Sequence, residues 1–186
     1  MKLTQLPFEA CRFLGLALYR AAGWRVEGEP PAASKFVVIA APHTSNWDLP
    51  LMLGVALQFR IRLHWMGKDS LFKPPFGWFM RALGGIAIDR SKANNVVTQM
   101  IDVFSACEKL AVAIPPEGTR SKVRYWKTGF YHIAHGAGVP IALGFLDYRR
   151  KVGGIGMTLT ASGDYDRDLE VIKNFYAGVT PKHAER

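Results

Sequence analysis

Short apolar runs alternate with longer amphipathic segments along most of the chain, and this alternation narrows the possible folds. The apolar runs have the length of strands and cover residues 36–41, 61–66, 85–89, 111–114, 140–145 and 155–161. The segments expected to be helical cover residues 47–59, 76–83, 94–109, 128–136 and 167–177. Strands that alternate with helices predict an α/β domain with a largely parallel sheet flanked by helices. In such a sheet a functional site forms just beyond the carboxyl ends of strands.

Residues 1–27 predict an N-terminal amphipathic helix that precedes the main domain. Apolar residues recur there at helical spacing, namely Leu6, Ala10, Phe13, Ala17, Ala21 and Trp24. The longest uncharged run, residues 13–19, is far shorter than the roughly 20 residues of a membrane-spanning helix. The helix lies either against a membrane surface or on the domain itself, and the sequence leaves both open. A short connector at residues 28–31 opens the remainder, residues 28–186, which we expect to form a single domain.

The chain carries a surplus of positive charge. Its 186 residues include 24 Lys and Arg against 15 Asp and Glu, a formal net charge of +9. Such a surplus favours polyanionic partners, and composition alone does not choose between anionic lipid, nucleic acid and a phosphorylated substrate. Cys11 and Cys107 lie far apart in the sequence and predict free thiols in a reducing compartment.

A histidine and an aspartate, His43 and Asp48, stand five residues apart directly after the first apolar run of the main domain. On one ideal helix, positions five apart differ by about 140° and do not face each other. The two side chains meet only if the chain turns between them, which Pro42 favours and a helix cap at Ser45 or Asn46 allows. Asp48 then orients the imidazole and leaves its second nitrogen free, the geometry of a general base. The alternative is a loop histidine beside a helix-capping carboxylate.

A second polar segment, residues 115–121, follows the apolar run at residues 111–114. Gly118 lets backbone amides approach a ligand, Thr119 offers a hydroxyl and Arg120 a planar cationic group, which together suit a phosphate ester. Glu117 repels phosphate, so we expect it to hold Arg120, bind a substrate hydroxyl or brace the loop. Taken by itself, the segment is also typical of a polar turn after a strand.

Together the two segments closely resemble the glycerophospholipid acyltransferase family, of the type that acylates 1-acylglycerol-3-phosphate. The family's four motifs are similar, in order, to His43-x4-Asp48, Gly85-Ile86-Ala87-Ile88-Asp89-Arg90, Pro116-Glu117-Gly118-Thr119-Arg120 and Val139-Pro140-Ile141. The resemblance implies that His43 is the catalytic base and that Asp48 orients it. It also implies an acceptor-binding set made of Arg90, Glu117, Gly118, Thr119 and Arg120.

The resemblance further implies the reaction and its setting. A fatty acyl group moves from an acyl thioester, either acyl-CoA or acyl carrier protein, to the hydroxyl of a lysophospholipid. We expect no cofactor, no metal and no nucleic-acid partner, and a peripheral location at the cytoplasmic face of a membrane. The alternative is a non-catalytic peripheral protein that binds anionic lipid, which accounts for the charge and gives no role to His43 and Asp48.

Two segments mix aromatic with basic residues in a way that suits lipid headgroups. The first contains Phe72, Lys73, Phe76, Trp78, Phe79 and Arg81, and the second contains Arg120, Lys122, Arg124, Tyr125, Trp126 and Lys127. For each, the alternative is a solvated basic face whose aromatic side chains turn into the core.

Two other patterns are expected to have no functional role. His132 and His135 have the spacing of helical metal ligands, but no third ligand follows nearby. The glycine-rich sequence at residues 153–156 lacks the strand-to-helix context of a nucleotide loop and predicts a flexible turn leading into a strand.

Overall fold

The protein is built around one sheet. The computed structural model describes residues 6–89, 93–119 and 123–183, and within them seven strands pair in the order β1-β7-β6-β2-β5-β3-β4. The strands are β1 (Arg25–Gly28), β2 (Lys35–Ala40), β3 (Leu63–Lys68), β4 (Gly85–Ile88), β5 (Leu110–Ile114), β6 (Ile141–Asp147) and β7 (Val152–Leu159). All neighbours run parallel except β6 and β7, which are antiparallel. The predicted α/β fold with a largely parallel sheet is confirmed.

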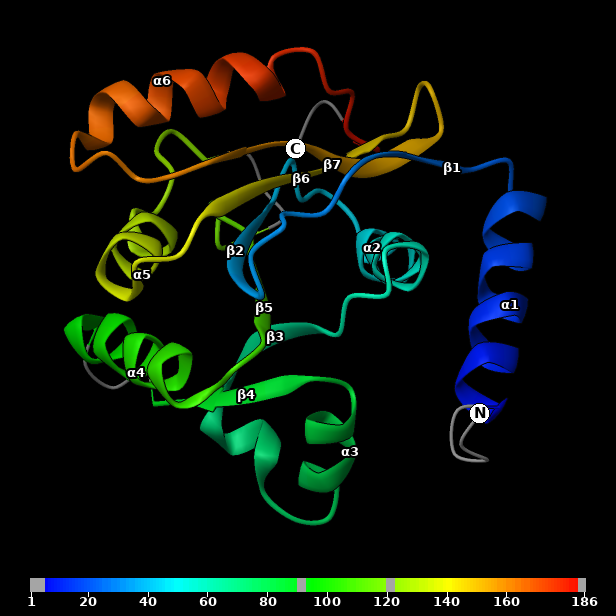
Figure 1. Cartoon of the computed structure of the whole chain (residues 1–186), viewed down its shortest axis with the longest axis horizontal. Helices are drawn as coiled ribbons and strands as arrows, with labels where there is room; N and C mark the ends of the chain where they lie inside the picture. Colours follow the sequence, from blue (N-terminus) through cyan, green and yellow to red (C-terminus); the bar gives the residue numbers. More distant parts are fainter. Residues whose placement is uncertain (1–5, 90–92, 120–122, 184–186) are drawn as a thin grey trace.

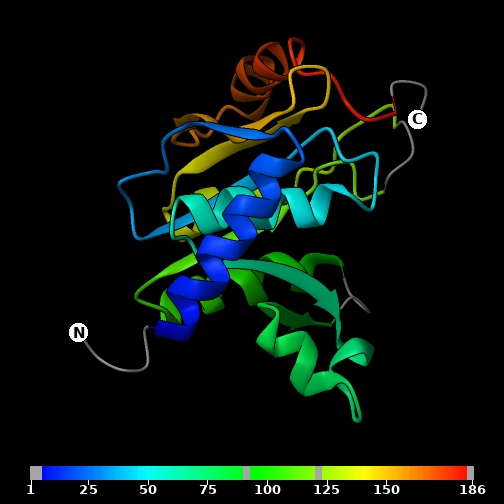
Figure 2. The ribbon, with the colours of Figure 1, turned by 90° about the vertical axis from the view of Figure 1, so that its right-hand side faces the viewer.

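Helices cover both faces of this sheet. They are α1 (Leu6–Ala21), α2 (Asp48–Gln58), the 3-10 helix η1 (Asp69–Phe72), α3 (Gly77–Ala82), α4 (Ala93–Ala106), α5 (Gly129–Ala137) and α6 (Tyr165–Tyr176). Figure 1 shows α1, α2 and α3 on one side of the sheet and α4 and α5 on the other, with α6 over the end formed by β6 and β7. Figure 2 views the molecule from the side that carries α1.

Alternation along the central strands supplies a core on each face. In β2, Val37 and Ile39 are fully buried and pack with α4, α5 and α6. Phe36 and Val38 point to the opposite face, where they pack with residues of β5, β6 and β7. Because both faces are covered, the strand has no polar side and forms one continuous apolar run, as parallel strands do.

The strand β1 and the glycines of β7 depart from the predictions. β1 has no apolar run and was not predicted, and it crosses the expected boundary between residues 27 and 28. The glycines at 153–156 lie inside β7, so the predicted flexible turn is wrong. A Cβ on Gly154 would collide with the carbonyl oxygen of Glu27, and one on Gly156 would collide with the ring of Phe175. These glycines therefore allow β1 and α6 to pack closely against β7.

The helix α1 packs on α2 with one side. The Arg12 Nε donates a hydrogen bond to the carbonyl oxygen of Leu57 at 2.9 Å. Tyr19, also a residue of α1, is buried. The other side leaves large apolar side chains in solvent, namely Phe13, Leu14 and Leu18. None of the described helices combines the length and apolar character that a membrane span requires.

Candidate active site

The two polar segments meet at the carboxyl edge of the sheet. β2 and β5 are parallel neighbours, so the loops that follow them leave the sheet at the same edge. The backbone N–H of His43, from the first loop, donates to Oε1 of Glu117, from the second, at 3.4 Å. The structure thus brings together residues 74 positions apart in the sequence.

His43 and Asp48 form a hydrogen-bonded pair. Nδ1 of the imidazole lies 3.0 Å from Oδ2 of the carboxylate. The Asp48 side chain is 3% exposed, whereas that of His43 is 28% exposed. Among the described residues nothing hydrogen-bonds to Nε2 of His43, so this nitrogen is free to take a proton from a ligand. The geometry is that of an oriented general base.

Four donors converge on the Asp48 carboxylate. Besides His43, the backbone N–H groups of Thr44 and Ser45 donate to Oδ2 at 3.0 and 2.9 Å. The hydroxyl of Tyr148 donates to Oδ1 at 2.6 Å. Burial raises the pKa of Asp48, but the hydrogen bonds from His43, Tyr148, Ser45 and Thr44 outweigh it and lower the pKa below its ordinary 3.8. Asp48 is therefore a carboxylate held in one orientation.

The turn between His43 and Asp48 forms differently from the expectation. The helix α2 begins at Asp48 with Trp47 as its N-cap residue, and no side chain caps it. The hydroxyl of Ser45 accepts a hydrogen bond from the Trp47 N–H at 3.2 Å, a local turn before the helix. The helix thus starts one residue after the predicted residue 47, and its N-cap residue is Trp47 rather than the expected Ser45 or Asn46.

Glu117 braces the histidine loop and keeps one oxygen unused. Its Oε1 accepts from the His43 N–H, while its buried Oε2 has no hydrogen-bond partner among the described residues. Burial raises the pKa of Glu117 above its ordinary 4.5, and the backbone N–H groups of Glu117 and His43 only partly offset this. An unpaired buried carboxylate oxygen beside a base suits a ligand hydroxyl that donates to it.

The remaining predicted binding residues divide into two groups. Gly118 adopts a left-handed φ of 63°, and a Cβ there would lie 2.7 Å from Nζ of Lys127. Lys127 therefore adds a cation to this loop that was not singled out for the site, and Thr119 is exposed beside it. Arg90 and Arg120 lie outside the described residues.

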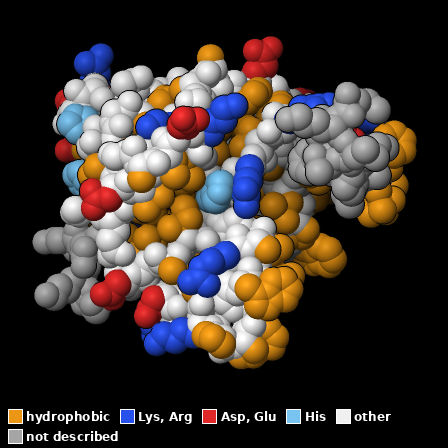
Figure 3. Space-filling view, turned by 60° about the horizontal axis from the view of Figure 1, so that its bottom comes forward, with side chains coloured by type: hydrophobic (Ala, Val, Ile, Leu, Met, Phe, Trp, Pro, Cys, Tyr) orange, Lys and Arg blue, Asp and Glu red, His pale blue; other side chains and the backbone are white. Residues whose placement is uncertain are grey.

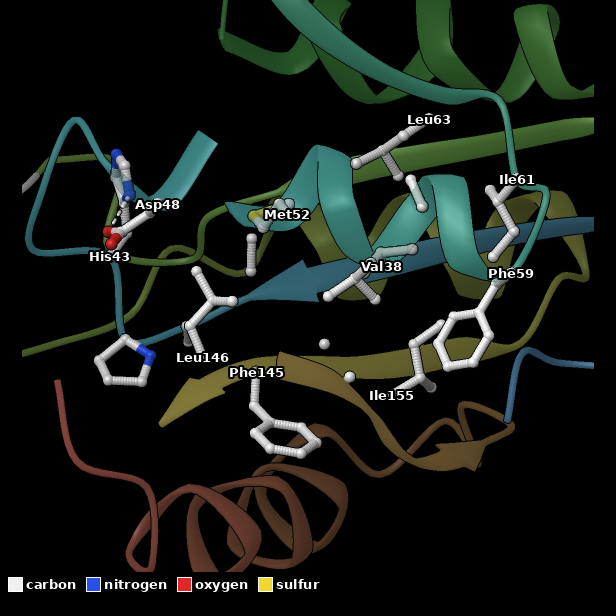
Figure 4. Close-up of a pocket in the computed structure, with 17 residues that line it drawn as sticks. Val38, His43, Asp48, Met52, Phe59, Ile61, Leu63, Phe145, Leu146 and Ile155 are labelled. Atoms are coloured by element: carbon white, nitrogen blue, oxygen red, sulfur yellow. Dashed lines mark hydrogen bonds and ion pairs between the residues drawn. The ribbon is translucent and has the colours of Figure 1, made fainter. Parts of the chain in front are cut away.

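An apolar cavity leads away from His43 beneath α2. It is lined from β2, α2, β3, β6 and β7, and with its part open to solvent it holds about 540 Å³ of empty space. Among the described residues that line it, only His43 and Asp48 have polar side chains. Figure 4 shows this pair at one end of the cavity, Val38 and Leu146 along it, and Phe59 and Ile61 at the far end.

The sequence did not identify Tyr148 or the cavity lining as parts of the site. Tyr148 follows the carboxyl end of β6, which is the other parallel neighbour of β2. Its place after a strand next to β2 was the available signal, since residues at adjacent carboxyl ends lie close together. The cavity residues carried no such signal, because apolar side chains of this kind equally fill a core.

Comparisons with known proteins identify the family to which this chain is similar. A family model described as acyltransferase matches residues 24–142. The chain is 33% identical over 134 residues to the 1-acyl-sn-glycerol-3-phosphate acyltransferase of Haemophilus influenzae, covering 67% of this chain and 54% of that protein. It is 32% identical over 152 residues to the enzyme of that name from Pseudomonas aeruginosa, covering 73% and 58%. The chain spans about half the length of the curated relatives it matches.

A solved structure shares the fold. It is the crystal structure of the 1-acyl-sn-glycerophosphate (LPA) acyltransferase, PlsC, from Thermotoga maritima, with a TM-score of 0.63 and 23% sequence identity. The match covers 91% of this chain and 78% of that one. At this identity the likeness establishes the fold.

Proposed function

Since the chain belongs to the acyltransferase family, as its motifs predicted, we propose that it moves a fatty acyl group from an acyl thioester to the hydroxyl of a lysophospholipid such as 1-acylglycerol-3-phosphate. The observation that carries the proposal is the placement of the His43–Asp48 pair at the end of an apolar cavity. A base beside a cavity without other polar lining suits a reaction between a hydroxyl and a carbonyl that bears a long hydrocarbon tail.

His43 is the general base of the proposed reaction. Its Nε2 takes the proton of the acceptor hydroxyl as that oxygen attacks the thioester carbonyl carbon. Asp48 holds Nδ1–H and stabilises the imidazolium that forms, as the carboxylate of a hydrolase triad does. When the carbon–sulfur bond breaks, the imidazolium returns the proton to the departing thiolate. The substrate hydroxyl is the nucleophile, so no acyl-enzyme intermediate is required.

The acyl chain of the donor occupies the apolar cavity. Burying hydrocarbon there removes it from water at a gain of about 0.8 kcal/mol per CH₂ group. Because the cavity begins at His43, a chain within it places its carbonyl carbon next to the base (Figure 4). Binding of the remote tail thereby positions the reacting carbon.

The acceptor binds on the other side of His43, at the loop that follows β5. The unpaired Oε2 of Glu117 accepts from an acceptor hydroxyl, and Gly118 opens the backbone to the phosphate. Thr119 and Lys127 add a hydroxyl and a cation, and the family resemblance adds Arg90 and Arg120 as phosphate ligands. The formal charge of +9 favours this anionic substrate and either donor, acyl-CoA or the acidic acyl carrier protein.

The acceptor is a membrane lipid, so the proposed enzyme works as a peripheral protein at the cytoplasmic face of a membrane and needs no cofactor. The exposed apolar side of α1, with Phe13, Leu14 and Leu18, is available for membrane contact.

The proposal is tested by acyl transfer from labelled acyl-CoA and labelled acyl carrier protein to a panel of lysophospholipids. We expect transfer to 1-acylglycerol-3-phosphate, and weaker transfer to lysolipids whose phosphate carries a further headgroup. Hydrolysis of the thioester without transfer, or no reaction with either donor while the protein is folded, would contradict it.

Replacing Glu117 with Gln is expected to separate stability from activity. A carboxyl group whose pKa is raised by folding stabilises the fold below its ordinary pKa and loses that contribution as the pH rises through the raised value. At neutral pH the ionised Glu117 therefore opposes folding, and Glu117→Gln, which keeps an acceptor for the His43 N–H, should raise the melting temperature by about 2–4 °C. The KM for the acceptor should rise at the same time.

Calorimetry and steady-state kinetics check the two halves of this prediction. A lower melting temperature with an unchanged acceptor KM would mean that Glu117 only braces the loop.

A further inference from the structure

Large apolar side chains are concentrated in solvent on η1 and α3. Trp78 is 72% and Phe76 68% exposed, and three neighbours are exposed by 42–49%. We call this set the α3 patch, and it consists of Leu71, Phe76, Trp78, Phe79 and Leu83. Figure 3, which brings the α3 end of the molecule forward, shows hydrophobic side chains gathered at its lower right. A contiguous apolar patch of this kind that is exposed to solvent marks an interaction site.

The α3 patch is held rigidly. Phe72 is buried, and its ring packs against Trp65 at a centroid distance of 5.9 Å. Arg81 donates to the carbonyl oxygen of Phe72 at 3.1 Å and lies over the same ring. The indole of Trp65 donates to the carbonyl oxygen of Leu83 at 3.0 Å. These contacts hold both ends of the segment from η1 to the end of α3. The exposed aromatic side chains therefore project from a backbone that is fixed in position.

The α3 patch also lies on the same side of the molecule as the apolar cavity that begins at His43. η1 follows the carboxyl end of β3, at the edge of the sheet where His43 follows β2. Together with α2, which roofs the cavity, α3 stands on one side of the sheet (Figures 1 and 2). α2 adds Leu49 and Leu53 to the exposed apolar side chains there.

Charge indicates what covers this surface. Residues 68–83 include three basic residues, Lys68, Lys73 and Arg81, and one acidic residue, Asp69. All three are exposed, and they lie in the same segment of the chain as the exposed aromatic residues. A segment that interleaves exposed aromatic residues with Lys and Arg suits the boundary of an anionic bilayer, where aromatic rings enter the headgroup region and cations meet phosphates.

We propose that the α3 patch docks this protein onto an anionic lipid surface, which, given the proposed function, holds the active-site side of the molecule against the membrane that contains the acceptor. We expect a bilayer rather than a second copy of the chain to bind the α3 patch. In a symmetric dimer, the positive side chains near the patch would face one another across the interface.

Binding to vesicles tests the docking surface without turnover. The double variant Phe76→Ser/Trp78→Ser is compared with Val171→Ser, an exposed apolar site on α6, which lies apart from α3. Vesicles contain phosphatidylcholine with or without 30% phosphatidylglycerol, a composition chosen as roughly that of an anionic membrane. We expect the double variant to bind anionic vesicles at least about tenfold more weakly, and Val171→Ser to bind as the unchanged protein does. Lys73→Gln should weaken binding about fivefold, and only to anionic vesicles.

Several outcomes would contradict the proposal that the α3 patch is a docking surface. Equal binding by the double variant and the unchanged protein is one, and equal loss in Val171→Ser is another. A dimer in sedimentation that the double variant dissociates would assign the patch to a second copy. Melting curves confirm that each variant is folded. Vesicle binding that depends on the patch in a protein without acyl transfer would refute the proposed function and leave the docking surface standing.

Discussion

His43→Ala is expected to lower kcat for acyl transfer by about 10²–10⁴-fold, with little change in the KM of either substrate. An alcohol is a weak nucleophile at neutral pH, and in this site Nε2 of His43 is the nitrogen placed to take its proton. The imidazole contributes to the transition state, in which the proton moves, more than to the ground-state complex. A loss in kcat without a loss in binding is the signature of such a group.

The matched control for this variant is His132→Ala. His132 is an exposed histidine of α5, on the opposite face of the sheet. It should retain full activity, and both variants should melt near the temperature of the unchanged protein, because His43 is itself part exposed. Activity in His43→Ala within a few fold of the unchanged protein would remove this residue from the mechanism.

The contact between His43 and Asp48 was predictable because its signals are local. His43 and Asp48 are five residues apart, directly after an apolar run, and parallel sheets place such a loop at a functional edge. The strand pattern also located β2 to β7 within a few residues. The edge strand β1 was not predictable in this way, since its sequence is Arg-Val-Glu-Gly and its pairing is supplied by β7, more than 120 residues away.

Contacts between distant segments account for the rest of the site. Tyr148 reaches Asp48 across 100 positions, and nothing in its own neighbourhood marks it as a partner of a carboxylate. The glycines of β7 give the same lesson. Their local pattern is that of a turn, whereas the close approach of Glu27 and Phe175, both remote in sequence, requires them. The sequence shows which functional groups the chain contains, whereas the fold determines which of them come into contact.

Asp48→Asn is expected to lower kcat by up to about 10⁴-fold while the structure of the site persists. An asparagine oxygen in the place of Oδ2 still accepts from Thr44 N–H, Ser45 N–H and Nδ1 of His43. Its amide then donates to the hydroxyl of Tyr148, which can turn from donor to acceptor. The orientation of the imidazole is kept, and what is lost is the negative charge that stabilises the imidazolium.

The pair Asp48→Asn and Asp48→Ala separates this charge from the scaffold. In Asp48→Ala the buried N–H groups of Thr44 and Ser45 lose their acceptor, at a cost of about 1–3 kcal/mol each. In denaturant unfolding, we therefore expect Asp48→Ala to have a much lower free energy of unfolding than Asp48→Asn. The two variants should be similarly inactive. Comparable activity in Asp48→Asn and the unchanged protein would show that Asp48 serves only as a scaffold.

The pH dependence of unfolding gives an independent check on the same carboxylate. Folding lowers the pKa of Asp48, so the ionised group stabilises the fold above its ordinary value of 3.8 and this contribution is lost as the pH falls through the lowered value. The difference in free energy of unfolding between the unchanged protein and Asp48→Asn should thus be largest near neutral pH and shrink in acid. A difference that stays constant across this range would mean that the charge of Asp48 does not contribute to stability. The hydrogen bonds from Tyr148 and the loop would then act on the carboxylate only to orient His43.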